Sequence, residues 1–263
     1  MSGPGFPDLF SRDAQGYAQF RPGYPAVLFE WIASLPAQRR LALDCATGNG
    51  QAATMLAPHF ARVLGIDASK PQLRSATRTA SVEYLAARAE ATPLRSRTVD
   101  FISVAQALHW LDRPRFFAEV ERIAAPGAAL AVWGYGRLRT APAFDALLDR
   151  FHDETVGPYW PPARKLVDAG YQGLALPIDE VAAPAFAIAS RLSLAEVLGY
   201  LRTWSAVGKY LAAHGHDPVE ALAPELTAVW GDPAERRPVS WPLFVRAGRW
   251  RGERLSPPER RSP

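Results

Sequence analysis

The segment from Leu41 to Asp67 constrains the fold more than any other part of the chain. It begins with an apolar run that ends near Asp44, continues through a loop of small residues and an amphipathic stretch, and closes a second apolar run on Asp67. This order predicts a strand, a tight turn, a helix and a parallel strand, with a carboxylate at the end of each strand. Ligands of open parallel sheets bind at those carboxyl ends, so an adenosine-containing cofactor is expected there.

Apolar runs and helical patterns continue to alternate along the chain. Strands are expected over 41–45, 62–66, 82–86, 99–104, 128–133, 184–190 and 239–247. Helices are expected over 25–35, 49–57, 114–124, 143–154 and 193–203, with Ser193 capping the last, and another helix follows Ser69 as its cap. The alternation predicts an α/β fold, a Rossmann-like seven-stranded mostly parallel sheet with helices on both faces and a helical cap from the second half.

One domain is expected, because no internal repeat or long linker divides the chain. Residues 36–136 form the expected cofactor-binding core and residues 137–235 the cap and substrate region. The remaining parts are an N-terminal lid and helix (1–35), a final strand (236–247) and a basic tail (248–263).

The net charge of +4 does not mark the chain as a nucleic-acid binder. From Arg246 onward there are six Arg and two Glu, while the preceding residues carry equal numbers of basic and acidic side chains. The excess charge therefore lies in a tail that is expected to be solvated, and the folded body shows no basic stripe.

Cysteine content and hydropathy exclude further classes. Cys45 is the only cysteine, so an intramolecular disulfide is impossible, and its apolar surroundings predict a buried packing residue. The N-terminus lacks an apolar signal core, and the most apolar stretch, 123–133, is too short to cross a bilayer. We therefore expect a cytoplasmic protein without a membrane partner.

Two cofactors compete at the turn after the first strand. The sequence GNGQAA at 48–53 matches the G-x-G-x-x-A fingerprint of dinucleotide binding, which would indicate an NAD-binding oxidoreductase. Against this, the glycines begin beyond the end of the strand, Asp44 would repel a pyrophosphate, and the loop holds no basic residue. The carboxylate of Asp44 suits S-adenosylmethionine instead, because the sulfonium and α-ammonium groups of this cofactor are positively charged.

The loop and the second acid fit the same cofactor. Ala46, Gly48 and Gly50 are small enough for the backbone to approach a ligand closely, and Asp67 could accept both ribose hydroxyls. Helix-capping roles in the turns remain an alternative for the two aspartates.

These motifs together resemble class I S-adenosylmethionine-dependent methyltransferases. The matching segments are DCATGNG at 44–50, GID at 65–67 and AEATPLRSRTVDFISVAQALHW at 89–110. YAQFRPGYP at 17–25 and the segment 105–110 are closer still to the trans-aconitate methyltransferase-like subgroup, and the resemblance covers most of residues 10–135. Relatives usually have glycine at the position of Ala46, where alanine fits if its φ is negative; Arg88 stands where relatives often have an acid.

The resemblance implies roles for further residues. Tyr17 and Arg21 would belong to an N-terminal lid, Ala68, Ala89 and Glu90 would lie near the adenine, and Gln106 would face the methionine end. His109 and Trp110 follow the fourth strand, where the methyl group would be presented. Ordinary surface or packing roles remain alternatives for the lid residues and for His109 and Trp110.

A small-molecule acceptor, first of all a carboxylic acid, is the expected substrate. A carboxylate is already ionised at pH 7 and needs no base, whereas a phenol, thiol or amine would need one, for which His109 is the candidate. Trp204, Lys209 and Tyr210 are the candidate substrate residues in the cap, with helix packing as the alternative. His214 and His216 lack further ligands, so no metal is expected.

Three other functions compete with this interpretation. They are an NAD-binding oxidoreductase, a cofactor-binding protein that has lost turnover, and a nucleic-acid methyltransferase. The last would carry an [ND]-P-P-[YFW] tetrapeptide after the fourth strand, where this chain reads AQALHW. The oligomeric state stays open.

Overall fold

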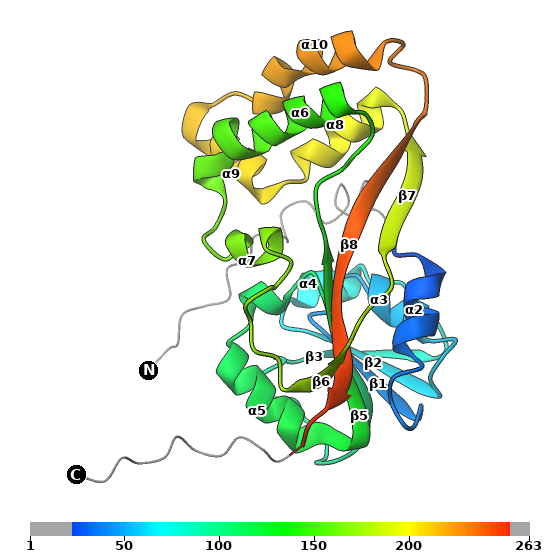
Figure 1. The fold of residues 1–263 in the computed structure, drawn as a ribbon. Coiled ribbons are helices and arrows are strands. Elements are labelled where there is room, and N and C mark those ends of the chain that lie inside the picture. Colours follow the sequence, from blue (N-terminus) through cyan, green and yellow to red (C-terminus); the bar gives the residue numbers. More distant parts are fainter. Residues whose placement is uncertain (1–22, 253–263) are drawn as a thin grey trace, which may run out of the picture.

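One mixed sheet of eight strands organises residues 23–252, the part of the chain that the computed structural model describes (Figure 1). The strand order is β3-β2-β1-β4-β5-β8-β6, and β7 also pairs with β8. The strands are β1 (Leu41–Cys45), β2 (Arg62–Asp67), β3 (Val82–Ala86), β4 (Val99–Ala105), β5 (Ala124–Tyr135), β6 (Ile178–Val181), β7 (Phe186–Leu192) and β8 (Arg237–Trp250).

The α/β prediction is confirmed, but the expected seven-stranded, mostly parallel sheet is only partly right. Strands β1 to β5 pair in parallel, whereas β8 pairs antiparallel with β5, β6 and β7. Strand β6 was not predicted, because only Ile178 of its four residues is buried. Strand β8 extends to Trp250, past the predicted end at 247, because β6 pairs with its last residues.

Alternating side chains of the central strands pack on the two faces of the sheet. Leu43 and Cys45 of β1 belong to a core that includes Phe116 and Val120 of α5 (Arg113–Ile123). Ala42 belongs to the opposite core, with helices α2 (Ala26–Ile32) and α3 (Gln51–Leu56). Figure 1 shows α5 and the α2–α3 pair on different sides of the sheet, as the period of two along a strand requires.

Two predicted helix starts are confirmed. The Ser69 side chain accepts a hydrogen bond from the Gln72 amide at the start of α4 (Lys70–Arg74). Ser193 forms a reciprocal capping box with Glu196 at the start of α8 (Leu194–Arg202). The helix predicted over 143–154 is instead α6 (Pro142–Arg150) followed by a π-helical turn, η3 (Phe151–Thr155).

The second half forms a helical upper lobe, the predicted cap. Its helices α6, α8, α9 (Ser205–His214) and α10 (Pro218–Trp230) enclose their own core, in which Trp230 and Trp241 are buried. Strands β7 and β8 run from the sheet up into this lobe, and the short helix α7 (Arg164–Asp168) lies between the two lobes (Figure 1). Among residues 23–252, no helix is both long and apolar enough to cross a membrane.

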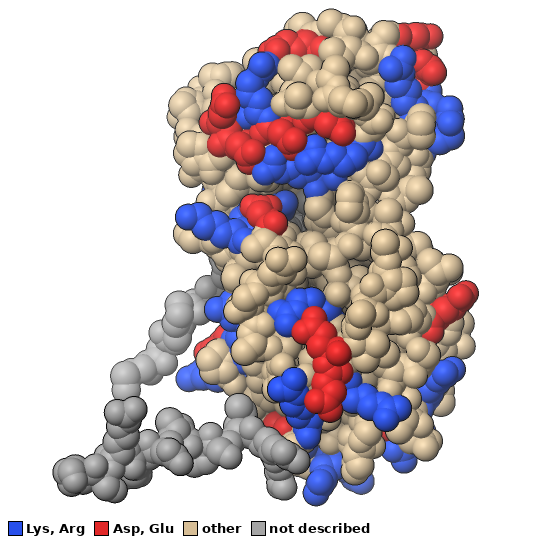
Figure 2. All heavy atoms as spheres, viewed as in Figure 1, with Lys and Arg blue, Asp and Glu red and all other residues tan. Residues whose placement is uncertain are grey.

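Charged side chains of both signs share the surface. On the face drawn in Figure 2, groups of Lys and Arg lie beside Asp and Glu. Ion pairs such as Arg246 with Glu180 and Arg251 with Asp179 also join charges of opposite sign.

Candidate functional site

A hollow lies at the carboxyl ends of β1, β2 and β4, where the sequence predicts the cofactor. It encloses about 870 Å³ of empty space, partly open to solvent. We call it the sheet-edge hollow; its lining residues are Tyr24, Asp44, Ala46, Thr47, Gly48, Asn49, Gln51, Ala52, Asp67, Ser69, Gln72, Ala105, Gln106, Ala107, Trp110 and Leu111. Among these lining residues, Asp44 and Asp67 are the only side chains of the Asp, Glu, Lys, Arg or His type.

Asp67 is held rigidly at the rim by backbone amides. Its Oδ2 accepts from the Gly48 amide at 2.8 Å and its Oδ1 from the Ser69 amide at 2.7 Å. Burial raises the pKa of Asp67, while the two amides oppose that shift. Each carboxylate oxygen has a second lone pair, so Asp67 can still accept two hydroxyl protons from a ligand.

Asp44 lies deeper and is almost completely buried. Its Oδ2 accepts from Thr47 Oγ1 at 2.6 Å and its Oδ1 from Ser103 Oγ at 2.7 Å. Burial raises the pKa of Asp44 to about 6, although these hydroxyls partly offset the effect. No cation compensates this buried charge among the described lining residues, so a positively charged ligand would stabilise it.

The loop between the two aspartates has an unusual backbone. Gly48 and Gly50 have φ of +57° and +86°, and Ala46 has φ of +53°. The condition stated for alanine at this position, a negative φ, is therefore not met. Ala46 carries the left-handed conformation in which relatives place glycine, because the Thr47 amide must turn back to the Ile66 carbonyl of β2. At Gly50, a Cβ would lie 2.1 Å from Tyr84 Oη, so this glycine makes room for a protein side chain.

We expect Ala46→Gly to stabilise the protein by about 0.5–1 kcal/mol. Left-handed backbone costs a non-glycine residue roughly 1–2 kcal/mol, of which the extra chain entropy of glycine cancels part. The midpoint of thermal unfolding should rise by about 1–4 °C. Ala221→Gly, the same change in the right-handed helix α10, should instead lower stability by about 1 kcal/mol; a fall in both variants would contradict the strain at Ala46.

A second hollow adjoins the first beneath the upper lobe, with about 680 Å³ of empty space. We call it the cap hollow. Its lining residues are Gln106, His109, Trp110, Tyr135, Gly136, Arg137, Trp160, Pro161, Arg164, Val167, Tyr200, Trp204 and Ser205. Gln106 and Trp110 line both hollows, so a ligand in one can meet a ligand in the other at these two residues.

His109 lies on the wall of the cap hollow, in the 3-10 turn η2 (Leu108–Trp110). Burial, helped by the charge of Arg164, lowers the pKa of His109 to about 3, so the imidazole is neutral at pH 7. Its Nδ1 lies 2.9 Å from Tyr171 Oη. Burial raises the pKa of the Tyr171 phenol, so this side chain keeps its proton at pH 7. When the phenol donates to Nδ1, the neutral imidazole carries its proton on Nε2, which is then an N–H donor.

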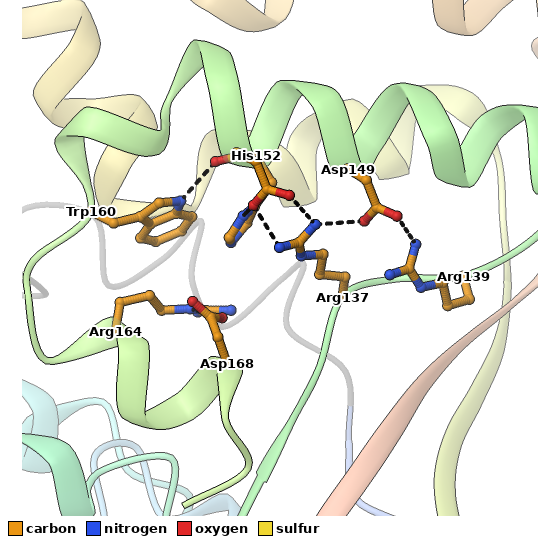
Figure 3. Close-up of polar contacts among 8 residues, drawn as sticks. Arg137, Arg139, Asp149, His152, Trp160, Arg164 and Asp168 are labelled. Atoms are coloured by element: carbon orange, nitrogen blue, oxygen red, sulfur yellow. Dashed lines mark hydrogen bonds and ion pairs between the residues drawn. The ribbon is translucent and has the colours of Figure 1, made fainter.

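The two arginines of the cap hollow differ in their partners (Figure 3). Arg137 donates to both oxygens of Asp153 at 2.6 and 2.9 Å and to Asp149 at 2.7 Å, so its charge is neutralised. Arg164 donates through Nε to Asp168 at 2.9 Å and lies against the Trp160 ring, 4.7 Å from its centroid. Within residues 23–252, the two Nη atoms of Arg164 have no hydrogen-bond partner.

Several predicted site residues lie outside both hollows. Ala68 is exposed, Ala89 is buried, and Glu90 accepts from the Asp112 amide at 3.1 Å, so Glu90 fixes the chain next to Leu111. In the cap, Trp204 lines the cap hollow, but Lys209 is exposed and Tyr210 packs against His214 on the same helix. Tyr17 and Arg21 lie outside the described residues.

Other residues of the two hollows were not singled out from the sequence. Thr47, Gln72 and Leu111 line the sheet-edge hollow, and Arg137 lines the cap hollow. Thr47 could have been predicted from its spacing. It comes three residues after Asp44, and a hydroxyl at that distance can donate back to the carboxylate. Arg137 gives no local signal, since its partners Asp149 and Asp153 come from α6 and η3.

Comparisons with known proteins point to methyltransferases. A family model described as a methyltransferase domain matches residues 43–132. A Dictyostelium discoideum protein with a provisional methyltransferase name is 33% identical over 216 residues, 81% of this chain and 82% of its own. A Saccharomyces cerevisiae protein named as an S-adenosylmethionine-dependent methyltransferase is 29% identical over 45% of this chain and 44% of its own.

A solved structure extends the likeness to nearly the whole fold. An Anaeromyxobacter dehalogenans protein, provisionally described as a type II methyltransferase, superposes with a TM-score of 0.83 and 43% sequence identity. The superposition covers 89% of this chain and 99% of that one.

Proposed function

This chain belongs to the S-adenosylmethionine-dependent methyltransferases, and from that premise we propose that it transfers a methyl group to an oxygen of a small carboxylic acid. The cofactor would occupy the sheet-edge hollow and the acid the cap hollow, with Gln106 and Trp110 at their junction. The finer resemblance, to the trans-aconitate methyltransferase-like subgroup, also supports an acidic acceptor.

One observation carries the choice of cofactor. Asp44 and Asp67 face a hollow whose described lining contains no Lys, Arg or His. Such a lining suits a nucleoside that carries positive charge and disfavours the two negative charges of a pyrophosphate. Asp67 would hold the ribose diol, and Asp44 would attract the ammonium or sulfonium group. These residues therefore fit S-adenosylmethionine better than NAD, although the loop matches the dinucleotide fingerprint.

The residues of the cap hollow suit an acceptor that is already an anion. The bound cofactor supplies a methyl group on a positively charged sulfur, which keeps the bonding electron pair when the carboxylate oxygen forms the new bond. No proton moves, so no base is required, in keeping with the low basicity of His109. His109 Nε2–H and the Arg164 guanidinium would orient the carboxylate, and the surrounding rings would exclude water.

Product analysis tests this proposal. The protein is incubated with S-adenosylmethionine and a panel of carboxylic acids, phenols, thiols and amines, and methylated products are identified by mass spectrometry. Methyl esters together with S-adenosylhomocysteine are expected. Products on phenols or amines alone would contradict the carboxylate assignment. Cofactor binding without any product would favour the alternative of a protein that has lost turnover.

We expect Arg164→Met to weaken binding of carboxylic acids by at least about tenfold, because one hydrogen bond to a charged group contributes roughly 1.5–3 kcal/mol. Binding of S-adenosylhomocysteine should not change, since Arg164 does not line the sheet-edge hollow. Isothermal titration calorimetry measures both. Lys209→Met is the matched control, because it removes an exposed cation of the upper lobe outside the hollow; an equal loss in both variants would contradict a specific role for Arg164.

A further inference from the structure

Aromatic rings form much of the cap hollow. Trp160, Tyr200 and Trp204 contribute to it from the upper lobe, and His109 and Trp110 from the turn after β4. Apart from Arg137 and Arg164, its described lining contains no side chain that is charged at pH 7. The hollow therefore offers flat apolar surfaces and very little charge.

The rings of the upper lobe are fixed before any ligand binds. Trp160 and Trp204 pack on each other, with ring centroids 5.6 Å apart. His152, in the π-helical turn, backs both rings at centroid distances of 5.0 and 5.5 Å. The Trp160 indole N–H donates to the His152 carbonyl at 3.3 Å (Figure 3). A wall held in this way loses little conformational entropy when a flat ligand stacks on it.

The cationic hydrogen-bond donors available to a ligand are the two Nη atoms of a single guanidinium. Asp149 and Asp153 already satisfy Arg137, and Asp149 also accepts from Arg139 (Figure 3). Of the two arginines that line the cap hollow, Arg164, beside Trp160, donates through Nε to Asp168 but has no partner at either Nη atom within residues 23–252. One carboxylate can pair with it. A second or third carboxylate would have to lose its water among aromatic rings with no cation to compensate, which is costly.

We infer that the methyl acceptor is a flat aromatic acid with a single carboxylate, whose ring stacks in the Trp160–Trp204 corner while the carboxylate pairs with Arg164. The inference rests on the proposed function and narrows its acceptor class. It departs from the polycarboxylate that the subgroup resemblance would suggest. The reason is the number of open donors in this hollow, because the Nη atoms of Arg137 are already paired with Asp149 and Asp153 and those of Arg164 suffice for one carboxylate.

Calorimetry with three probe acids tests the inference, with S-adenosylhomocysteine present. Benzoate, cyclohexanecarboxylate and propane-1,2,3-tricarboxylate share the anionic group but differ in ring character and charge. Benzoate should bind about 2- to 13-fold more tightly than cyclohexanecarboxylate, the range that stacking of 0.5–1.5 kcal/mol gives. The tricarboxylate should bind more weakly than both. Equal affinity of the two monoacids, or tighter binding of the tricarboxylate, would overturn the inference.

Variants test the stacking on Trp160 and the pairing with Arg164 separately. Trp160→Leu should abolish the preference for benzoate, and Trp160→Phe, which retains a ring and guards against misfolding in the first variant, should keep it. Arg164→Met should weaken both monoacids by the same factor. A benzoate preference that survives in Trp160→Leu would count against the Trp160–Trp204 corner as the binding surface.

Failure of the inference can be told apart from failure of the proposed function. If S-adenosylhomocysteine binds and the tricarboxylate is preferred, the aromatic monoacid is wrong and the methyltransferase site stands. If benzoate binds to the cap hollow as described while S-adenosylhomocysteine does not bind at all, the cofactor assignment fails and the inference about the cap hollow stands.

Discussion

Asp67→Ala should reduce the affinity for S-adenosylmethionine and S-adenosylhomocysteine by about 100- to 10⁴-fold. The variant removes an acceptor that can bind two ribose hydroxyls, and each hydrogen bond to a charged group contributes roughly 1.5–3 kcal/mol. The carboxylate is already oriented by the amides of Gly48 and Ser69, so little reorganisation accompanies ligand binding. Isothermal titration calorimetry with both nucleosides and with NAD(H) measures the effect.

Two further variants show what a loss in Asp67→Ala means. Asp67→Asn preserves the size of the side chain and one acceptor oxygen. Its affinity for both nucleosides should therefore lie between those of the wild type and Asp67→Ala. Glu83→Ala, which removes an exposed carboxylate of β3 paired with Arg62, should bind both nucleosides normally. Wild-type binding by Asp67→Ala would show that the ribose lies elsewhere, and binding of NAD(H) alone would favour the oxidoreductase.

The parts of this fold that the sequence predicts well are those with local causes. Strands β1 and β4 are apolar because the sheet is covered on both of its faces there. Ser69 and Ser193 cap helices through contacts with residues three positions further along the chain. Asp44 and Asp67 meet at one edge because parallel neighbouring strands end there. The cofactor side of the site therefore follows from short segments of sequence.

The acceptor side depends on contacts between distant segments. Arg137 and Arg164 look alike in the sequence. Asp149 and Asp153 nevertheless occupy both Nη atoms of Arg137, whereas Asp168 contacts only Nε of Arg164. Lys209 is close to Trp204 in the chain, but helix α9 carries it away from the hollow. Likewise, the conformation of Ala46 reflects a hydrogen bond between β2 and the loop rather than the preference of alanine.

His109→Asn should change how stability depends on pH. In the folded protein the pKa of His109 is about 3, against 6.5 for an exposed histidine. Between these values the unfolded chain binds a proton that the folded chain does not, so the contribution of His109 to stability falls as the pH decreases. From pH 7 to pH 4 this amounts to about 3 kcal/mol, at 1.36 kcal/mol for each pKa unit. The variant should therefore gain about 3 kcal/mol relative to the wild type over that range.

The stability contribution of Asp44 changes with pH in the opposite direction. It would mask the effect of His109 if only the wild type were measured. Its pKa is about 6 in the folded protein and 3.8 in the unfolded chain, so the folded state binds the extra proton as the pH falls. The contribution of Asp44 to stability is greatest below pH 3.8 and is lost as the pH rises through 6. From pH 7 down to pH 4 this contribution therefore increases by about 2 kcal/mol. Asp44→Asn should accordingly lose about 2 kcal/mol relative to the wild type over that range.

Urea unfolding of the three proteins at several pH values between 4 and 7 resolves the two groups. A constant difference between a variant and the wild type reports only lost contacts, such as that of His109 with Tyr171. A difference that changes with pH reports the shifted pKa. Parallel profiles for His109→Asn and the wild type would mean that His109 titrates normally. It would then be available again as a base, and acceptors with a proton to lose, such as phenols and amines, would become the first to screen.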